Sequence, residues 1–488
     1  MGDLMSRYIS FIRLLVIPVI TLGAIQFFFG LLSMLLFHDS VGKDFFEPAI
    51  VFGMFSLVFL MSTSKFSEVS MSLRQALLFV SLTWIVCSVE ASVPIRLIEH
   101  ISLTDSVFES VSALTTTGAT VLQGLDEQPK TFLMYRQFLQ WFGGMGVVVF
   151  VVAILPKLNV GGMKIFLAET PGPAKGEKLA PRITHTARYL WFIYFGLTFL
   201  CIVGYLFTGM GLFDSVAHAF TTVSTGGFST HDTSLGFFHS HWVELNSMIF
   251  MLLGATSFAL HFYFTQTKDL SVYTKDEENK DFLWLVVILS ILLCLILLGN
   301  HVFSDFDDSV FEAVFQLISF ITSTGYATSD FVHWPAATAL LLIFAGYIGG
   351  CAGSTAGGNK MIRNIISVKV IGRQLKQLIH PKGQFTVKYN GRPVKEDISA
   401  ATMSYMGIAA ILTMVLSFIL QTTGLDFWSS FTAVAACLNV LGPAFGELGA
   451  NFQPVNDFGT WVLTFTMLLG RLEFFTLLVL FSPNYWKF

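Results

Sequence analysis

The stretch ITSTGYATSD, residues 321–330, decides the fold, because its Ser-Thr-Gly-Tyr core is typical of an ion filter with a single glycine. Such a filter replaces the hydration shell of the ion with backbone carbonyls, and glycine allows the conformation that aims them inward. Comparable stretches are centred on Gly118, Gly227 and Gly442. Each follows a short apolar segment and precedes a polar loop and a long apolar run. The repetition predicts a pore with four-fold pseudosymmetry, built from one chain.

Polar residues support a true repeat. Glu109, His218 and Gln316 each lie nine positions before a predicted filter glycine, whereas the fourth repeat has Ala433 there. Gly227 is chosen over its neighbour in the second repeat because it preserves this spacing. The fourth filter also departs in having Val and Leu where the first and third have Thr or Ser. The predicted ion-binding residues are Thr116, Thr117, Gly118, Thr225, Gly226, Gly227, Ser323, Thr324, Gly325, Val440, Leu441 and Gly442.

Composition places the chain in a membrane. Of its 488 residues, 54% are hydrophobic and 12% are charged, against about 25% charged in soluble domains. The mean hydropathy of +0.68 and the 51 Phe residues predict a polytopic helical protein. The first apolar run, 11–37, is too long for a cleavable signal peptide. The five cysteines form no CxxC pair and predict no metal cluster: Cys87, Cys201, Cys294, Cys351 and Cys437.

The predicted architecture is all-α, with about ten transmembrane helices and four re-entrant pore helices. Apolar runs at 9–37 and 45–63 form an accessory hairpin, and four units of helix, pore helix and helix follow. Long runs suit a bilayer core of about 30 Å, while the short segments must be buried in protein or line a cavity. Long helices are predicted at 70–98, 131–157, 184–209, 241–267, 282–300, 335–372, 398–423 and 457–482, and short ones at 104–116, 212–224, 308–322 and 427–438. The divisions are 1–66 for the hairpin, 67–165, 166–270 and 271–380 for pore units one to three, and 381–488 for a cytoplasmic hairpin and unit four.

Charge sets the predicted orientation. Segments 157–182 and 363–395 are rich in Lys and Arg and are therefore assigned to the cytoplasm, as are both termini. The loops after the short segments are acidic and face outward, where they either concentrate cations or are simply solvated. Residues 384–394 alternate around Asn390-Gly391, which predicts a β-hairpin. That hairpin is either a docking point for a partner or a plain connector.

A glycine-rich stretch breaks the helix predicted over 335–372. At membrane depth such an irregular segment must line a cavity, which predicts a gate on the cytoplasmic side of the filter; close helix packing through small residues is the alternative. The order Gly358-Asn359-Lys360 excludes a nucleotide-binding P-loop. The predicted gating residues are Gly349, Gly350, Gly353, Ser354, Thr355, Gly357, Gly358 and Arg471.

Arg471 is predicted near the middle of the last helix. An arginine at the bilayer centre costs about 2.5–3.5 kcal/mol on insertion scales, so it should face the bundle interior or water. We assign it to the pore below the filter, as a barrier to cations, with a buried ion pair as the alternative. Glu90, also within the membrane, is given a structural role.

The predicted ion is K⁺ or Rb⁺. Four pore helices would point their C-termini, each carrying roughly half a negative charge, at the filter. The filter itself contains no carboxylate, and neutral carbonyls favour a monovalent cation over Mg²⁺ or Ca²⁺. One glycine per repeat predicts weaker discrimination against Na⁺. No covalent cofactor and no nucleic-acid partner are expected.

Six motifs carry a resemblance to the superfamily of Trk, Ktr and HKT potassium transporters, and within it to the bacterial Trk-type membrane subunit. They are TTTGAT (115–120), STGGFS (224–229), TSTGYATSD (322–330), NVLGPAFGELG (439–449), GGCAGSTAGGNK (349–360) and GRLEFF (470–475). The resemblance implies a filter glycine at 118, 227, 325 and 442, an intramembrane gating loop at 349–360, and Arg471 beneath the filter. It also implies a homodimer in the bacterial inner membrane whose cytoplasmic face binds a TrkA-like ring of nucleotide-binding regulatory subunits.

Three functions compete. The first is potassium uptake through a channel-like pore, gated by the loop and regulated from the cytoplasm. The second is a gradient-coupled K⁺/H⁺ or K⁺/Na⁺ symporter with alternating access at a midplane site, against which four parallel repeats argue. The third, a membrane enzyme, is disfavoured because there is no HExxH motif and no nucleophile elbow.

Overall fold

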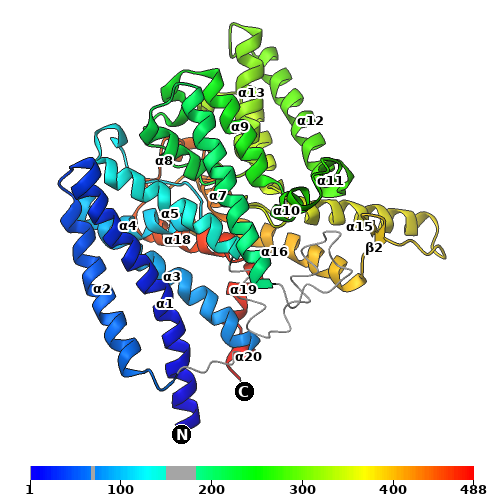
Figure 1. Cartoon of the computed structure of the whole chain (residues 1–488). Coiled ribbons are helices and arrows are strands. Elements are labelled where there is room, and N and C mark those ends of the chain that lie inside the picture. Colours follow the sequence, from blue (N-terminus) through cyan, green and yellow to red (C-terminus); the bar gives the residue numbers. More distant parts are fainter. Residues whose placement is uncertain (1, 67–71, 150–182, 488) are drawn as a thin grey trace.

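The structure, a computed structural model, describes residues 2–66, 72–149 and 183–487 and is almost entirely helical (Figure 1). Within these residues, six helices are long and apolar enough to cross a membrane, and two bent helix pairs raise the number to eight. The prediction of an all-helical, multi-span protein is confirmed. The other two predicted spans correspond to α5 (Lys130–Val149) and to α14 (Ala336–Ile348) with α15 (Met361–Ile379), which do not meet the same criterion. The basic segment at 157–182 lies outside the described residues.

The accessory hairpin consists of α1 (Gly2–Leu32), which continues as a π-helical turn over Ser33–Phe37, and α2 (Gly42–Ser62). It lies along one side of the molecule (Figure 1). The amide of Gln26 in α1 donates to the backbone carbonyl of Glu90 at 3.1 Å, which ties the hairpin to the first repeated unit.

Four units follow, each with a long helix, a short helix and a second helix. Their long helices are α3 (Leu73–Glu99), α7 (Ile183–Phe207), α12 (Glu277–Gly299) and α16 (Glu396–Gln421). Their short helices are α4 (Leu103–Leu114), α8 (Leu212–Val223), α13 (Phe306–Ile321) and α17 (Phe427–Leu438). Their second helices begin with α5, α9 (His241–Ala255), α14 and α18 (Asp457–Arg471).

The short helices are internal. Ten of the twelve residues of α4 are buried, although several of them are Ser, Thr or Glu. Side-chain caps fix where two of these helices begin: Ser102 accepts from the amide of Asp105 at 3.0 Å, and Asp426 from that of Ser429 at 3.0 Å. Helices of this length cannot span a bilayer and are tolerated because the surrounding bundle encloses them.

Two second helices are broken where the sequence predicted one continuous span. Over 241–267, α9 and α10 (Phe258–Thr267) meet at 94°, and over 457–482, α18 and α19 (Phe474–Leu478) meet at 116°. The first break has a long-range cause. The carbonyl of Ala255 accepts from the amide of Cys351 (2.9 Å), and the amide of Phe258 donates to the carbonyl of Gly353 (3.0 Å), so another segment takes up hydrogen bonds that a continuous helix would make internally.

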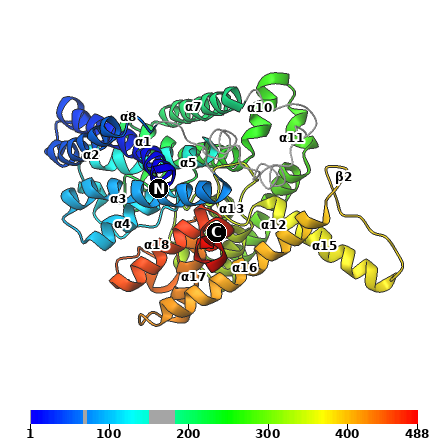
Figure 2. The ribbon, with the colours of Figure 1, turned by 90° about the horizontal axis from the view of Figure 1, so that it is seen from below.

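The third unit has the predicted break, with α14 and α15 separated by residues 349–360. The predicted β-hairpin is also confirmed: β1 (Lys388–Tyr389) pairs antiparallel with β2 (Arg392–Pro393). In both views α15 projects from the bundle and carries the chain to this hairpin (Figures 1 and 2). The remaining short helices are α11 (Ser271–Lys275), α20 (Pro483–Trp486) and the 3-10 turns Leu125–Glu127, Ser234–Phe238, Phe331–His333, Gly446–Leu448 and Val479–Phe481.

Candidate functional site

All four short helices end in the same hydrogen-bonded turn. In each, the residue before the predicted filter glycine donates its amide to the carbonyl five residues earlier, the 6→1 bond of a Schellman motif. The four bonds run from Thr117 to Ser112 (2.9 Å), Gly226 to Thr221 (2.8 Å), Thr324 to Ser319 (2.9 Å) and Leu441 to Ala436 (2.9 Å). The repeat inferred from sequence is therefore a repeat of backbone geometry.

Each turn contains two residues with positive φ, two positions apart. The second is the predicted glycine, with φ of 80° at Gly118, 77° at Gly227, 81° at Gly325 and 90° at Gly442. The first is not glycine: it is Thr116 (58°), Thr225 (53°), Ser323 (53°) or Val440 (56°). A β-branched residue rarely adopts positive φ, and strained backbone of this kind concentrates at functional sites. Because Val440 adopts it too, the fourth unit has the same chain path despite its different side chains.

The four glycines form a closed ring, here called the glycine ring (Gly118, Gly227, Gly325 and Gly442). A Cβ atom added to any of them would lie closer than 3.0 Å to a carbonyl oxygen of the next unit. The contacts, from glycine to carbonyl, are Gly118 to Gly226, Gly227 to Thr324, Gly325 to Leu441 and Gly442 to Thr117. The fourth contact returns to the first unit, so four consecutive repeats enclose one axis.

Polar side chains on the short helices hold the chain that leaves the ring. The three residues predicted at the repeated position all do this: Glu109 Oε1 accepts from Val121 N (2.7 Å), His218 Nε2 contacts Ser229 Oγ (2.9 Å) and Gln316 Nε2 donates to Thr328 Oγ1 (3.2 Å). In the fourth unit Ala433 cannot do so. Its neighbour Thr432 accepts from the amide of Phe445 at 3.0 Å instead.

Neighbouring units are also joined by side chains. The hydroxyl of Tyr326, directly after the third glycine, lies 2.5 Å from that of Thr221 on α8. Gln140 on α5 donates to the carbonyl of Gly226 (2.7 Å) and accepts from the amide of Phe228 (3.1 Å). These bonds fix the second turn against the first and third units.

Sequence reasoning missed Arg136, which lies in α5. It is 1% exposed, pairs with Glu109 at 3.2 Å and lies 4.1 Å from the centre of the Phe228 ring. A positive charge within an apolar run was the available signal, because such residues are seldom placed there without a partner. The pair offsets the charge of Glu109, the buried carboxylate that holds the chain after the first turn.

Residues 349–360, here called the intramembrane loop, lie against the turns. Gly357 N donates to the hydroxyl of Ser323, Gly358 N donates to the carbonyl of Asn439 at 3.0 Å, and Thr355 Oγ1 donates to the carbonyl of Val223 at 3.1 Å. The loop thus contacts the C-terminal ends of three short helices. Three of the predicted gating residues, Gly349, Gly353 and Gly358, have positive φ.

Arg471 lies against the intramembrane loop. It is 8% exposed and lies at the end of α18, not in the middle of a long helix as predicted, because the chain turns at Leu472. Its guanidinium donates to the carbonyl of Thr355 in the intramembrane loop (3.2 Å) and to that of Gly143 in α5 (3.2 Å). It therefore joins the first and fourth units to the loop. Glu473 pairs instead with Arg363.

Ionisable groups also join the loops that follow the first two turns. Asp232 accepts from the amides of Gly124 (3.0 Å) and Leu125 (3.2 Å), and His231 Nδ1 lies 2.5 Å from Asp126. Burial lowers the pKa of His231, but the neighbouring carboxylates of Asp214 and Asp126 outweigh it, so that the pKa is raised above its ordinary value. We call the contact of His231 with Asp126 and Asp214 the histidine clasp.

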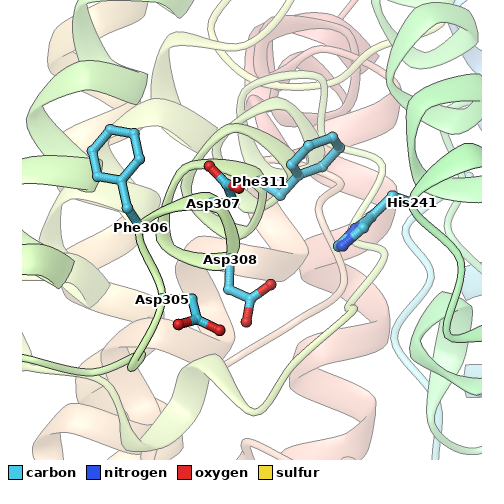
Figure 3. A pocket seen from close by; sticks show the side chains of 6 residues that line it. All are labelled: His241, Asp305, Phe306, Asp307, Asp308 and Phe311. Atoms are coloured by element: carbon cyan, nitrogen blue, oxygen red, sulfur yellow. The ribbon is translucent and has the colours of Figure 1, made fainter.

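Further along the same predicted outer face is an open cavity of about 520 Å³. Figure 3 shows the carboxylates of Asp305, Asp307 and Asp308 around it, and His241 and Phe311 also line it. Within the described residues, no group of three or more His, Cys, Asp or Glu side chains is arranged to hold a metal ion. The cavity is an acidic recess in the wall of the third unit.

Comparisons with known proteins give matches over most of the chain. The profile of a family described as TrkH, cation transport protein, matches residues 42–488. The chain is 42% identical to the Trk system potassium uptake protein TrkH of Vibrio parahaemolyticus serotype O3:K6, over 93% of this chain and 95% of that one. It is 40% identical to TrkH of Escherichia coli strain K12 over the same shares. The crystal structure of the potassium transporter TrkH from Vibrio parahaemolyticus superimposes with a TM-score of 0.90, 39% identity and coverage of 99% of this chain and 100% of that chain.

The histidine clasp predicts a pH-dependent stability. Because the folded pKa of His231 is raised, the clasp stabilises the protein fully below the ordinary pKa of 6.5, and this contribution is lost as the pH rises through the folded value. The unfolding temperature of the wild-type protein should exceed that of His231→Gln by a few degrees at acidic pH, and this difference should narrow as the pH rises. His333→Gln, which removes an exposed histidine paired with Asp330, is the control. A gap that widens with pH would contradict the assignment.

Proposed function

The chain belongs to the TrkH family of cation transport proteins, and on that premise we propose that it takes up potassium through the glycine ring. The observation that carries the proposal is the closed set of contacts by which each ring glycine meets a carbonyl of the next unit. Four repeats that enclose one axis at the C-terminal ends of four buried helices supply what a cation path needs. The protein is accordingly a transporter and not an enzyme.

Potassium suits the chemistry of the ring. Carbonyl oxygens replace its hydration shell, and the C-terminal ends of α4, α8, α13 and α17 add partial negative charge. The turns contain no carboxylate, and Glu109 is paired with Arg136. The hydroxyl of Thr116 is buried without a hydrogen-bond partner among the described residues, so it is one more oxygen able to face a dehydrated cation.

The intramembrane loop is proposed as the gate. Its hydrogen bonds to three short helices put it next to the turns, and Arg471 adds a buried positive charge that opposes a cation there. Opening then requires the loop to leave Ser323 and Asn439 and the guanidinium to leave Thr355. This assigns both the loop and Arg471 to one barrier.

The cellular setting follows from the family. We propose that the protein works as a homodimer in the bacterial inner membrane, with both termini in the cytoplasm. Its relatives are named as parts of a Trk system, which supports a cytoplasmic partner of the nucleotide-binding, TrkA-like kind. The hairpin at the end of α15 is the exposed element best placed to meet it (Figure 2).

Flux into proteoliposomes that contain this chain alone tests the proposal. Downhill uptake of K⁺ and Rb⁺ is expected without any Na⁺ or H⁺ gradient, and Arg471→Ala should raise it by about tenfold or more, because it removes the buried charge from the barrier. Arg373→Ala, which removes a surface pair with Glu396, is the control. Uptake that requires an imposed gradient would favour alternating access, and wild-type flux in Arg471→Ala would remove this residue from the barrier.

Substitution in the ring tests the filter. Gly118→Ser and Gly325→Ser should each lower the K⁺ to Na⁺ permeability ratio, because a side chain would displace the carbonyl of the next unit. Gly124→Ser is a matched control, since Gly124 has a φ of 72° but nothing within 4 Å of an added Cβ. If both ring variants keep the wild-type ratio, the ring is not the filter.

A further inference from the structure

The first turn of α12 is a point where four separate segments meet. Asp276 caps the helix by accepting from the amide of Asn279 at 3.0 Å. The side-chain oxygen of Asn279 accepts from Thr256, at the break between α9 and α10, at 3.2 Å. The two residues between them, Glu277 and Glu278, make all their side-chain hydrogen bonds outside their own helix. This turn is therefore built to hold other parts of the chain.

Glu278 holds the intramembrane loop. It is 4% exposed, and its Oε1 accepts from the amide of Ala352 at 2.7 Å and from that of Ile362 at 3.0 Å. Ala352 lies on the arm of the loop that follows α14, and Ile362 lies in the first turn of α15, just beyond the other arm. One carboxylate oxygen thus joins both ends of the loop to a third helix. Because Asp276 already caps α12, the position of Glu278 is not explained by capping.

The β-hairpin holds the same turn from the cytoplasmic side. Asn390 lies in the tight turn of the hairpin, and its backbone N–H donates to Glu277 Oε2 (2.8 Å). Its side-chain oxygen accepts from the backbone N–H of Glu277 (2.9 Å), and its side-chain nitrogen donates to Asp276 (3.0 Å). Lys369 of α15 bridges Glu277 and the carbonyl of Lys388. Both views place the hairpin beside the segment that contains α11 and the start of α12 (Figures 1 and 2).

The hairpin and the loop also share one apolar core. Val387 and Tyr389 of the hairpin are 5% and 6% exposed and belong to the same buried cluster as Cys351 and Ile362. Movement of the hairpin away from α12 would therefore disturb both the hydrogen bonds of Glu277 and the packing around the loop. The contacts are continuous from the surface hairpin to the loop.

We propose that Glu278 is a positioning residue that latches both arms of the intramembrane loop, and that the hairpin, through Asn390 and Glu277, keeps this latch in place. The inference rests on the proposed role of the loop as the gate. In this proposal, the first turn of α12 transmits a displacement of the cytoplasmic hairpin to the loop. Losing the acceptor at residue 278 leaves two buried amides unpaired, which favours release of the loop.

Cys351, in the loop and fully buried, reports release directly. In a chain whose other four cysteines are alanine, Glu278→Ala should speed modification of Cys351 by N-ethylmaleimide about tenfold, because labelling follows local opening. Glu278→Gln keeps an acceptor oxygen and should stay close to the parent rate. Asp281→Asn, one turn further along α12, is the control. Rubidium flux is measured on the same samples and should rise with labelling.

Asn390→Ala guards against a folding failure at the buried site, because it removes the side-chain hydrogen bonds of the hairpin to Glu277 and Asp276 and leaves Glu278 in place; a smaller increase in labelling is expected. Unchanged labelling of Cys351 in Glu278→Ala and Asn390→Ala proteins that unfold at the parent temperature would overturn the latch, whatever the flux. Faster labelling without increased flux would uphold the latch and refute the proposed role of the loop as the gate. The two proposals therefore fail separately.

Discussion

The structure depends on one packing constraint, the contact between each ring glycine and the carbonyl oxygen of the following unit. Only a residue without Cβ can combine positive φ with a neighbouring carbonyl at this distance. Because Gly442 packs against Thr117, the constraint closes on itself and fixes the four units around one axis. The bundle has to bring four helix ends together around that axis to satisfy it.

Other features follow from holding these turns. Glu109, His218, Gln316 and Thr432 each pair with the chain after the turn, so four different side chains do one job. The second helices must also pass close by: a Cβ on Gly143, Gly254 or Gly470 would overlap the backbone carbonyl of a short helix. These helices end or bend beyond this contact, and the intramembrane loop and Arg471 lie next to the turns there. Backbone that would be costly in lipid is thereby paired within the protein.

Much of this could be predicted from sequence, because repetition in a chain reports repetition in space. Local signals in the sequence predict the short helices, the break at 349–360 and the Asn390-Gly391 hairpin. The spacing of the repeat also selects Gly227, and not Gly226, as the residue that matches the other ring glycines. The bends after Ala255 and Arg471 have no such local signal, and the first arises from hydrogen bonds to a distant segment. The positive φ of Thr116 and Val440 contradicts their local preference and is imposed by the turn. The link from Asn390 to Glu278 joins residues more than a hundred positions apart, and no periodicity reveals it.

We propose that a dehydrated cation binds in the glycine ring, and anomalous diffraction from crystals of this protein grown in Rb⁺ tests that proposal most directly. It predicts a Rb⁺ peak on the axis of the ring, within coordinating distance of the carbonyls around Gly118, Gly227, Gly325 and Gly442, and loss of the peak when Na⁺ replaces Rb⁺. An empty ring, with Rb⁺ found only in the acidic cavity beside Asp305, would contradict it.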